Sequence, residues 1–321
     1  MEYIIGMDGG GTKTNCVIAD TEGNILYKTT GGPSNFLISG TEEVSKVIFE
    51  LIENCKNQLN INYSEIKFIL IGVTGGGRRT DSERLEKSFI SFSKLKGIEF
   101  ENVLVESDAR IALEGAFSGK PGSILIAGTG SIMFGKDEDG NIHRVGGFGR
   151  FLGDEGSGYS IGHKGLVAVA KEFDGRGEHS DITRLLNEKF SIDSSESLIT
   201  KVYKDNFNIA SAAPLVIDAA SGNDKIAVRI IDEETEALIS YIETMVKKID
   251  KPVLNISFIG GILLSDNVFS RTLRDKIAKI LPNVILIEAE NPPEVGALLM
   301  IKRLLKNKKQ FLFNLRLKRL S

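Results

Sequence analysis

Short apolar runs alternate with polar or glycine-rich stretches through the first third of the chain. Runs of five to seven residues rich in Ile, Val and Leu are typical of strands, and apolar positions spaced by three or four are typical of helices. The pattern predicts strands at 3–7, 14–20, 25–30, 68–73 and 103–107, and helices at 42–58, 80–96 and 109–117. Strands come first, and strands then alternate with helices. We therefore expect a mixed α/β domain with its chemistry at the carboxyl ends of the strands.

The second half of the chain repeats features of the first half in the same order. The matched segments are 11–25 with 128–142, 68–76 with 257–261, and 102–116 with 283–297, at offsets of 117, 185 and 181. The jump in offset implies an insertion, and helical patterns within about 155–235 supply it. Each match is short, but their common order indicates a duplicated domain.

The length of 321 residues also suggests two domains. We expect an N-terminal lobe at 1–117 and a larger C-terminal lobe at 118–321, with a cleft between them. The run from Lys302 to Ser321 contains eight basic residues and no acidic one. This pattern fits a solvated helix that packs back on the first lobe, or a helix on a membrane surface.

Charge and cysteine content exclude several classes of function. The net charge of -3, from 40 basic and 43 acidic residues, offers no basic surface for nucleic acid. The first residues contain neither a secretory segment nor a membrane span, so we expect a cytoplasmic protein without a membrane partner. Cys16 and Cys55 form no CxxC pair, which argues against a zinc site or an iron–sulfur cluster within one chain.

Two glycine-rich loops follow corresponding strands of the two repeats. Asp8–Thr14 offers backbone N–H groups, two hydroxyls, an ammonium and a carboxylate, and Ala127–Ser131 repeats part of this chemistry. Successive N–H groups in such a loop form a concave site for an anion. The chain has no P-loop pattern. We expect two phosphate clamps that face each other from two domains, although a tight structural hairpin is the alternative for each loop.

Asp108 closes a predicted strand and opens a predicted helix. This position places a carboxylate at the carboxyl edge of a sheet, where it is a candidate for catalysis. The structural alternative is that Asp108 serves as the N-cap of the helix 109–117, which is a common role for Asp.

The segment 146–158 contains six glycines in thirteen residues and leads into an apolar helix. Such a loop can lay its backbone against a flat polar ligand such as a pyranose, with Asp154 or Glu155 accepting hydrogen bonds from sugar hydroxyls. A flexible entry to the helix is the alternative. The three histidines have no ligand-like spacing, and we assign no role to His143, His163 or His179.

These motifs resemble the BadF/BadG/BcrA/BcrD ATPase family of the actin/hexokinase/Hsp70 superfamily, and within it the N-acetylglucosamine kinases and related murein amino-sugar kinases. The segments that carry the resemblance are DGGGTKT at 8–14, GTGS at 128–131, GGFGRFLGDEGSGY at 146–159 and FIGGIL at 258–263. The likeness spans nearly all of residues 3–301. It implies duplicated actin-like (ribonuclease H-like) α/β domains, with two lobes around a nucleotide and sugar cleft.

The resemblance also implies roles for individual residues. Asp108 would be the general base, and Asp8 would reach Mg²⁺ through water. The implied nucleotide contacts, besides Asp8, are Gly10, Gly11, Thr12, Lys13, Gly128, Thr129, Gly130, Ser131, Gly260 and Gly261. The implied sugar contacts, besides Asp108, are Asn35, Thr74, Gly147, Phe148, Asp154 and Gly158. Phe148 stands where kinases of this group often have Trp, which leaves the choice of sugar open.

The function implied is the phosphorylation of an amino sugar with ATP and Mg²⁺ by a homodimeric enzyme. N-acetylglucosamine is the first expected acceptor, giving the 6-phosphate, and N-acetylmuramic acid, glucosamine or another hexose is the alternative. A place in amino sugar metabolism and peptidoglycan recycling follows from this. The rival reading is an ATPase activator of a 2-hydroxyacyl-CoA dehydratase-type enzyme. Those activators bind a [4Fe-4S] cluster between subunits through paired cysteines, a motif that Cys16 and Cys55 do not fit.

Overall fold

The computed structural model describes residues 1–318, and their side chains through residue 307. The chain divides into two units. Unit 1 consists of Met1–Pro121 and the segment that begins at Ala289, and unit 2 is Gly122–Glu288. The expected boundary after residue 117 is therefore moved to Pro121. The assignment of the last segment to the second lobe is corrected, because the chain returns to unit 1 from Ala289 onward.

Unit 1 is built on a mixed five-stranded sheet, with the strands in the order β3-β2-β1-β4-β5. The strands are β1 (Tyr3–Gly9), β2 (Thr14–Asp20), β3 (Ile25–Gly31), β4 (Ile66–Val73) and β5 (Val103–Ser107). β1, β4 and β5 run parallel, and β2 and β3 are antiparallel to their neighbours. The strands predicted from the sequence are present, with ends shifted by at most two residues.

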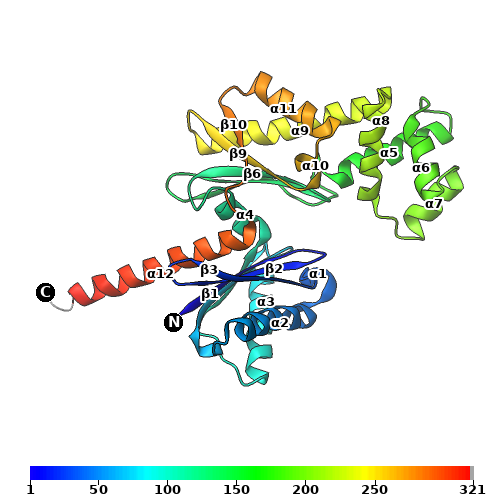
Figure 1. Ribbon diagram of the computed structural model, residues 1–321. Coiled ribbons are helices and arrows are strands. Elements are labelled where there is room, and N and C mark those ends of the chain that lie inside the picture. Colours follow the sequence, from blue (N-terminus) through cyan, green and yellow to red (C-terminus); the bar gives the residue numbers. More distant parts are fainter. Residues whose placement is uncertain (319–321) are drawn as a thin grey trace. The chain divides into compact units, whose positions relative to one another are not determined.

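Helices cover both faces of this sheet (Figure 1). The helices of unit 1 are α1 (Phe36–Ser39), α2 (Thr41–Leu59), α3 (Arg79–Leu95), α4 (Asp108–Ala116) and α12 (Pro293–Lys318), with a short 3₁₀ turn at Tyr63–Glu65. Alternation along β1 decides which face each residue joins. Ile5 and Met7 pack in the cluster that includes α2 and α3, whereas Ile4 packs in the cluster with α4 and α12.

Unit 2 repeats the sheet of unit 1. Its strands are β6 (Gly122–Ala127), β7 (Ser131–Lys136), β8 (Ile142–Gly146), β9 (Leu254–Ile259) and β10 (Val284–Ile287). Their order, β10-β9-β6-β7-β8, is that of unit 1 read from the other edge. β6 pairs with β7 antiparallel and with β9 parallel, as β1 pairs with β2 and β4. The expected duplication is confirmed by this common topology.

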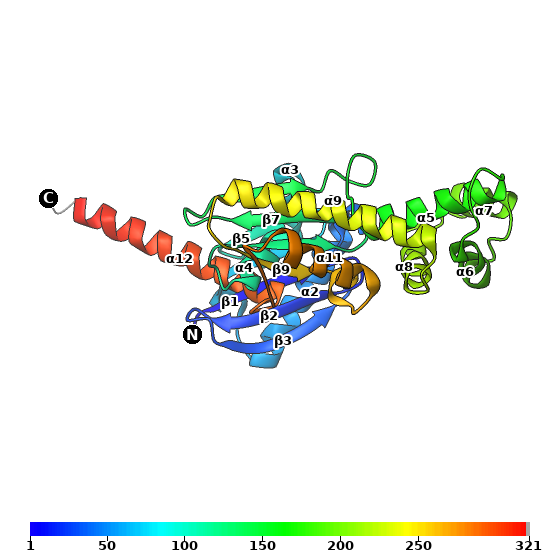
Figure 2. The same cartoon turned by 90° about the horizontal axis from the view of Figure 1, so that it is seen from above.

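The inserted segment of unit 2 is helical, as predicted. It contains α5 (Gly158–Phe173), α6 (Asp181–Phe190), α7 (Ser195–Tyr203), a 3₁₀ turn at Ile209–Ala212, α8 (Ala213–Ser221) and α9 (Lys225–Ile249). α10 (Gly261–Leu264) and α11 (Val268–Ile280) complete the unit. The helix α9 lies along the sheet of unit 2, whereas α6 and α7 lie beyond the end of this sheet (Figure 2).

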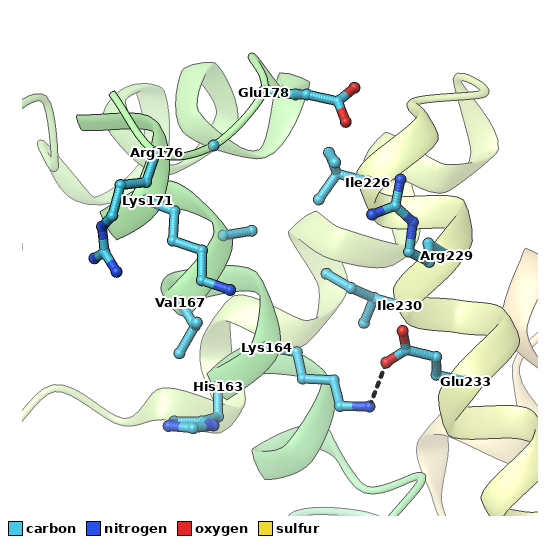
Figure 3. Close-up of a pocket in the computed structure, with 12 residues that line it drawn as sticks. His163, Lys164, Val167, Lys171, Arg176, Glu178, Ile226, Arg229, Ile230 and Glu233 are labelled. Atoms are coloured by element: carbon cyan, nitrogen blue, oxygen red, sulfur yellow. Dashed lines mark hydrogen bonds and ion pairs between the residues drawn. The ribbon is translucent and has the colours of Figure 1, made fainter. Parts of the chain in front are cut away.

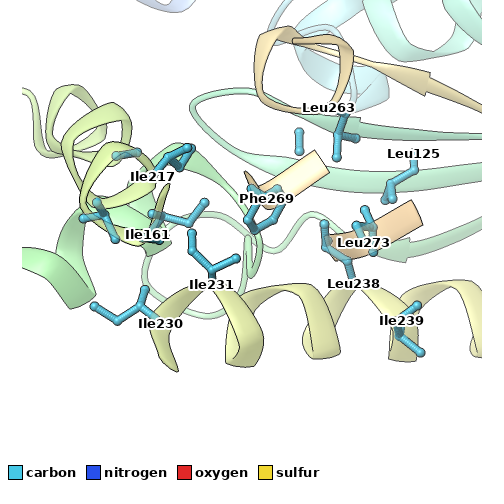
Figure 4. Packing of buried hydrophobic residues seen from close by; sticks show 14 of the residues in the cluster. Leu125, Ile161, Ile217, Ile230, Ile231, Leu238, Ile239, Leu263, Phe269 and Leu273 are labelled. Atoms are coloured by element: carbon cyan, nitrogen blue, oxygen red, sulfur yellow. The ribbon is translucent and has the colours of Figure 1, made fainter. Parts of the chain in front are cut away.

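One continuous apolar cluster joins the sheet of unit 2 to the inserted helices (Figure 4). Leu125 from β6, Ile161 from α5, Leu238 from α9 and Phe269 from α11 are all fully buried in it. Because the cluster is continuous, the inserted helices are held to the sheet, α9 directly and α6 and α7 through α5 and α8.

The basic C-terminal run begins on the surface of unit 1. Arg303 forms an ion pair of 3.2 Å with Glu114, and Leu305 packs against the cluster formed by α4, α12 and the sheet. These contacts fit the expected packing on the first lobe, and the side chains of residues 308–321 lie outside the described ones. In the part of the chain described, no helix has the length and apolar character needed to span a bilayer.

Helices α4 and α12 approach each other at two glycines. A Cβ atom added at Gly296 would lie 1.9 Å from the carbonyl oxygen of Ile111, and one at Gly115 would lie 2.8 Å from the carbonyl oxygen of Pro292. No side chain fits at either position. Gly115 and Gly296 correspond in the sequence repeat, so matched positions of the two halves meet here in unit 1.

We predict that Gly296→Ala destabilises the protein by about 1–3 kcal/mol, because the added methyl group overpacks the helix crossing. In an unobstructed helix, replacing Gly by Ala stabilises the protein by up to about 1 kcal/mol. The sign of the change in the free energy of unfolding therefore shows whether the methyl group is obstructed. Urea denaturation measures the effect. Gly77→Ala is the control, since a Cβ there meets no atom within 4 Å. A Gly296→Ala variant more stable than the wild type would contradict the close approach of α4 and α12 at this position.

Candidate active site

The carboxyl edge of the first sheet gathers three of the predicted site residues. Asp8 lies near the end of β1, Thr74 follows β4 and Asp108 follows β5. The backbone N–H of Thr74 donates to the carbonyl oxygen of Gly9 at 2.9 Å. The Thr74 hydroxyl donates to Oδ2 of Asp108 at 2.7 Å. The parallel strands thus bring Asp8, Thr74 and Asp108 to one place, as the sequence pattern indicated.

The interpretation of Asp108 as the N-cap of the following helix is wrong. Ser107 is the N-cap, and its hydroxyl oxygen accepts a hydrogen bond from the N–H of Arg110 at 3.2 Å. Asp108 is the first residue of α4, and its Oδ1 accepts from the N–H of Ala109 at 2.8 Å. Ser107 therefore leaves the Asp108 carboxylate free of the capping role, and two donors fix its orientation.

Sequence reasoning missed a further acidic residue at this edge. Glu294 lies in the first turn of α12 and is only 8% exposed. Its Oε2 atom is buried and has no hydrogen-bond partner among the described residues. An acidic residue at the start of a helix is ordinary, because it interacts favourably with the helix dipole. The available signal was a single carboxylate directly before the apolar run VGALLMI.

The electrostatics of this edge are dominated by its carboxylates. Burial raises the pKa of Asp8 to about 7, with further increases from the charges of Glu294 and Asp108, whereas Lys13 lowers the pKa. Three carboxylates in one partly buried place repel one another, so the site favours a positive partner.

The first glycine-rich loop is anchored at its base and exposed at its tip. The N–H of Gly10 donates to the carbonyl oxygen of Lys13 at 3.0 Å, while Gly11, Thr12 and Lys13 are exposed. Asn35 follows a little later and caps α1, because its Oδ1 accepts from the N–H of Leu37 at 3.2 Å. The side-chain oxygen of Asn35, which was predicted to contact a sugar, therefore already accepts one local hydrogen bond.

In unit 2, the second glycine-rich loop contacts the segment 146–158. The N–H groups of Gly158 and Tyr159 donate to the carbonyl oxygens of Gly128 and Thr129 at 2.8 and 3.1 Å. A Cβ atom at Gly130 would lie 2.8 Å from Oδ2 of Asp154. The structure thus brings the predicted phosphate loop of this unit together with the predicted sugar-binding segment.

The two candidate acids of this segment differ in their partners. Oε2 of Glu155 accepts a hydrogen bond of 2.5 Å from the hydroxyl of Tyr241, which occupies one carboxylate oxygen. Oδ1 of Asp154 accepts from the N–H of Gly149 at 3.1 Å, and burial raises the pKa of Asp154. Oδ2 of Asp154 faces the second glycine-rich loop at Gly130, whereas one oxygen of Glu155 is held by Tyr241.

The remaining predicted residues of unit 2 border the same loop. The hydroxyl of Ser131 donates to the carbonyl oxygen of Glu155 at 2.6 Å. Gly260 has φ of 100°, and a Cβ there would lie 2.3 Å from the carbonyl oxygen of Ala127, so only glycine fits. Gly261 is exposed. Phe148 is 70% exposed, with the Arg144 guanidinium 5.5 Å from its ring centroid.

Two cavities of unit 2 adjoin these residues. One of about 510 Å³ is lined by Thr129, Gly130 and Asp154, together with Arg150 and Tyr159. The other, of about 230 Å³, is lined by residues of the loop, the start of α5, α8 and α10, among them Gly128, Thr129, Gly158, Pro214 and Ile262. Residues of the second glycine-rich loop therefore line both hollows.

A further cavity of about 530 Å³ lies between α5 and α9 and contains none of the predicted site residues (Figure 3). Lys164 and Glu233 form an ion pair of 2.7 Å at its edge. The histidines assigned no role have local partners. The ring of His163 stacks on that of Tyr159, and His143 and His179 contact Asp137 and Glu172.

The predicted site residues therefore form one group in each unit. Unit 1 carries Asp8, Gly10, Gly11, Thr12, Lys13, Asn35, Thr74 and Asp108. Unit 2 carries Gly128, Thr129, Gly130, Ser131, Gly147, Phe148, Asp154, Gly158, Gly260 and Gly261. Within residues 1–318, no three His, Cys, Asp or Glu side chains are grouped closely enough to hold a metal ion directly.

Comparison with known proteins places these features in context. A family model described as the BadF/BadG/BcrA/BcrD ATPase family matches residues 5–300. An N-acetylmuramic acid/N-acetylglucosamine kinase of Clostridium acetobutylicum is 32% identical, and the match covers 94% of this chain and 99% of the relative. An N-acetyl-D-glucosamine kinase of Dictyostelium discoideum is also 32% identical, with 93% and 97% covered.

Solved structures share the architecture. A protein from Chromobacterium violaceum is 25% identical, with a TM-score of 0.73 and coverage of 93% of this chain and 98% of that one. A ROK hexokinase from Thermus thermophilus is 17% identical, with a TM-score of 0.57 and coverage of 96% and 99%. The second likeness concerns the fold alone.

The raised pKa of Asp8 predicts how stability depends on pH without nucleotide or metal. The native pKa of about 7 exceeds the usual 3.8, so the native state retains the proton more strongly than the unfolded state. The contribution of Asp8 to stability is fully present below pH 4 and is lost as the pH rises through 7. The unfolding temperature of Asp8→Asn, minus that of the wild type, should therefore increase from pH 4 to pH 8. Thermal melts in EDTA measure this difference. A difference that stayed constant between pH 4 and pH 8 would contradict the raised pKa of Asp8.

Proposed function

Because the chain belongs to the BadF/BadG/BcrA/BcrD ATPase family, we propose that it is an ATP-dependent kinase that phosphorylates a hydroxyl group of an amino sugar. The prediction of a sugar kinase is confirmed by the family and by the named activities of the relatives. N-acetylglucosamine, phosphorylated at its 6-hydroxyl, is the first acceptor that we propose, and N-acetylmuramic acid is the second. A glucosamine kinase of Vibrio cholerae, 23% identical over 73% of this chain, keeps glucosamine among the alternatives.

The observation that carries the mechanism is the fixed carboxylate of Asp108 at the carboxyl edge of the first sheet. Thr74 and the N–H of Ala109 each hold one of its oxygens, which restricts its rotation. We assign Asp108 as the general base. It orients the acceptor hydroxyl and takes its proton as the oxygen bonds to the γ-phosphorus, while the bond from this phosphorus to ADP breaks.

The loops supply donors for the phosphates. Phosphoryl transfer requires mainly positioning and charge stabilisation, and a glycine-rich loop presents its N–H groups without side chains in the way. We assign Thr12, Lys13 and Thr129 to phosphate oxygens. We assign the cavity beside Gly128 and Ile262 to the nucleoside, because Gly260 and Gly261, which are predicted nucleotide contacts, directly precede Ile262.

The cation expected with ATP fits the chemistry of the unit 1 edge. Asp8 is partly buried among carboxylates, and no cluster of described residues could hold an ion directly, so contact through water is the arrangement that we propose. Bound Mg²⁺ would supply positive charge for the phosphate oxygens. Asp8 would orient its water ligands through hydrogen bonds.

Sugar contacts are proposed for residues of both units. In unit 2 they are Asp154, Gly147, Phe148 and Gly158, and in unit 1 they are Asn35 and Thr74 besides Asp108. The exposed ring of Phe148 can cover the apolar face of a pyranose. A homodimer, a cytoplasmic location and a role in peptidoglycan recycling remain predictions.

The cysteines argue against the rival activator function. Cys16 and Cys55 are buried in the core of unit 1, with their Sγ atoms 3.7 Å apart. A cluster shared between subunits needs thiolates at a surface, and these two thiols are not there. We therefore keep the kinase as the proposed function.

We predict that Asp108→Asn lowers kcat by about 10²–10⁴-fold and changes KM for the sugar little, because the amide keeps the shape but cannot accept the proton. Steady-state kinetics of ADP release measure both parameters. Asp81→Asn, in the first turn of α3, is a control that removes a carboxylate from another helix start of the same unit. Near-normal turnover of Asp108→Asn would remove this residue from the mechanism.

The acceptor is tested by a coupled assay of ADP release with N-acetylglucosamine, N-acetylmuramic acid, glucosamine and glucose. We expect kcat/KM for at least one N-acetylated sugar to exceed that for glucose about tenfold or more, since a site that binds the acyl group loses those contacts with glucose. If none of the four sugars stimulated ADP release by the wild-type protein, the proposed function would be wrong.

A further inference from the structure

We propose that Glu294 is a positioning residue for the divalent cation that accompanies the nucleotide, and that its buried carboxylate accepts hydrogen bonds from water bound to this cation. This inference rests on the proposed function and extends it to a residue that no sequence motif indicated. It follows from the place of Glu294 in the fold, from its burial and from its lack of a partner.

The alternation of β1 determines the place of Glu294 relative to Asp8. Ile4, Gly6 and Asp8 point to the same face of the sheet, since side chains alternate along a strand. Ile4 packs in the cluster that contains Ile301 of α12, and a Cβ at Gly6 would lie 2.4 Å from the carbonyl oxygen of Glu294. The helix therefore runs along β1 with its first turn toward Asp8.

The close approach at Gly6 brings two carboxylates to the same end of the strand. Asp8 is the next residue on this face after Gly6, and Glu294 lies in the first turn of the helix that covers the face. The charges of Glu294 and Asp108 both raise the pKa of Asp8, and Glu294 has the larger effect of the two. Glu294 and Asp8 therefore share one region of unit 1.

The burial of Glu294 calls for a partner that the chain does not supply. The residue is 8% exposed, and its Oε2 atom has no hydrogen-bond donor among the described residues. A buried carboxylate oxygen without a donor is costly, and structures retain such groups where a ligand or ordered water satisfies them. The carboxylate of Asp8 repels that of Glu294. The missing partner is therefore a positive group, or water polarised by one.

Water ligands of a cation fit this requirement. Mg²⁺ keeps several of its waters when bound in proteins, and each water can donate to a carboxylate. Groups that orient the ligands of a metal in this way commonly affect its affinity by about 10- to 100-fold. Interaction with the dipole of α12 is the alternative role for Glu294, but it would leave Oε2 without a donor.

The test separates these roles by measuring nucleotide affinity with and without the cation. Calorimetry with a non-hydrolysable imido analogue of ATP is carried out in EDTA and in saturating Mg²⁺ for the wild type and Glu294→Gln. We expect Mg²⁺ to strengthen binding of the analogue to the wild type, and this gain to fall about tenfold in Glu294→Gln. In EDTA the variant should bind the analogue as tightly as the wild type or more tightly, because a negative charge near the phosphates is removed.

Two further variants define the controls. Glu294→Asp keeps the charge and should retain part of the gain from Mg²⁺. Glu43→Gln makes the same change in the first turn of α2, where the residue is exposed, and should behave as the wild type. Circular dichroism melts establish that each variant is folded. If Glu294→Gln lost its fold, the test would rest on Glu294→Asp. The proposal would then be overturned if Glu294→Asp were as stable as the wild type and gained as much affinity from Mg²⁺ as the wild type does.

A result of equal affinity changes in EDTA and in Mg²⁺ would also overturn the proposal, since it would indicate a structural role in the helix. The sugar assay on the same wild-type preparation distinguishes this failure from failure of the proposed function. A wild-type enzyme that phosphorylates a sugar, with a Glu294→Gln variant that keeps the full gain from Mg²⁺, would refute the role of Glu294 alone.

Discussion

The close packing of α12 against β1 and α4 is the constraint on which the chemistry of unit 1 depends. Glycines at positions 6, 115 and 296 let backbone meet backbone, so the helices lie nearer to the sheet and to each other than side chains would allow. At this distance, the first turn of α12 and the first turn of α4 both reach the carboxyl edge of the sheet. The position of Glu294 relative to Asp8 thus depends on glycines that leave room for the backbone of α12, whereas Asp108 is placed by the end of β5.

The duplicated sheets carry different chemistry at corresponding edges. Both have the same strand order, and both place a glycine-rich loop after the first strand of the repeat. In unit 1 the edge is acidic, and its carboxylates come from β1, α4 and α12. In unit 2 the loop lies beside hollows lined by the inserted helices. One fold, used twice, thereby carries an acidic edge in one unit and two hollows beside the corresponding loop in the other.

Local patterns in the sequence were sufficient to predict most elements and the composition of each loop. Strand periodicity and glycine spacing are local properties, so the ends of β4 and β5 and the place of Asp108 could be predicted, whereas β1 extends two residues beyond its predicted end. The role of Ser107 as the N-cap could not, because Ser and Asp are both good caps and only backbone geometry chooses between them. Glu294 and the return of the last segment to unit 1 depend on packing between residues far apart in the chain, which no window of sequence contains.

The return of α12 to unit 1 has a consequence for biosynthesis. Ile4, Val17 and Leu70 form one face of the first sheet together with Ile301, yet all of unit 2 lies between Leu70 and this helix in the chain. On the ribosome, the strands emerge long before their cover, so an apolar surface stays open while the whole second unit is translated. Unit 2, as a continuous segment with its own core, can fold in that interval. Glu294 then joins Asp8 and Asp108 last, when the final helix closes over the strands.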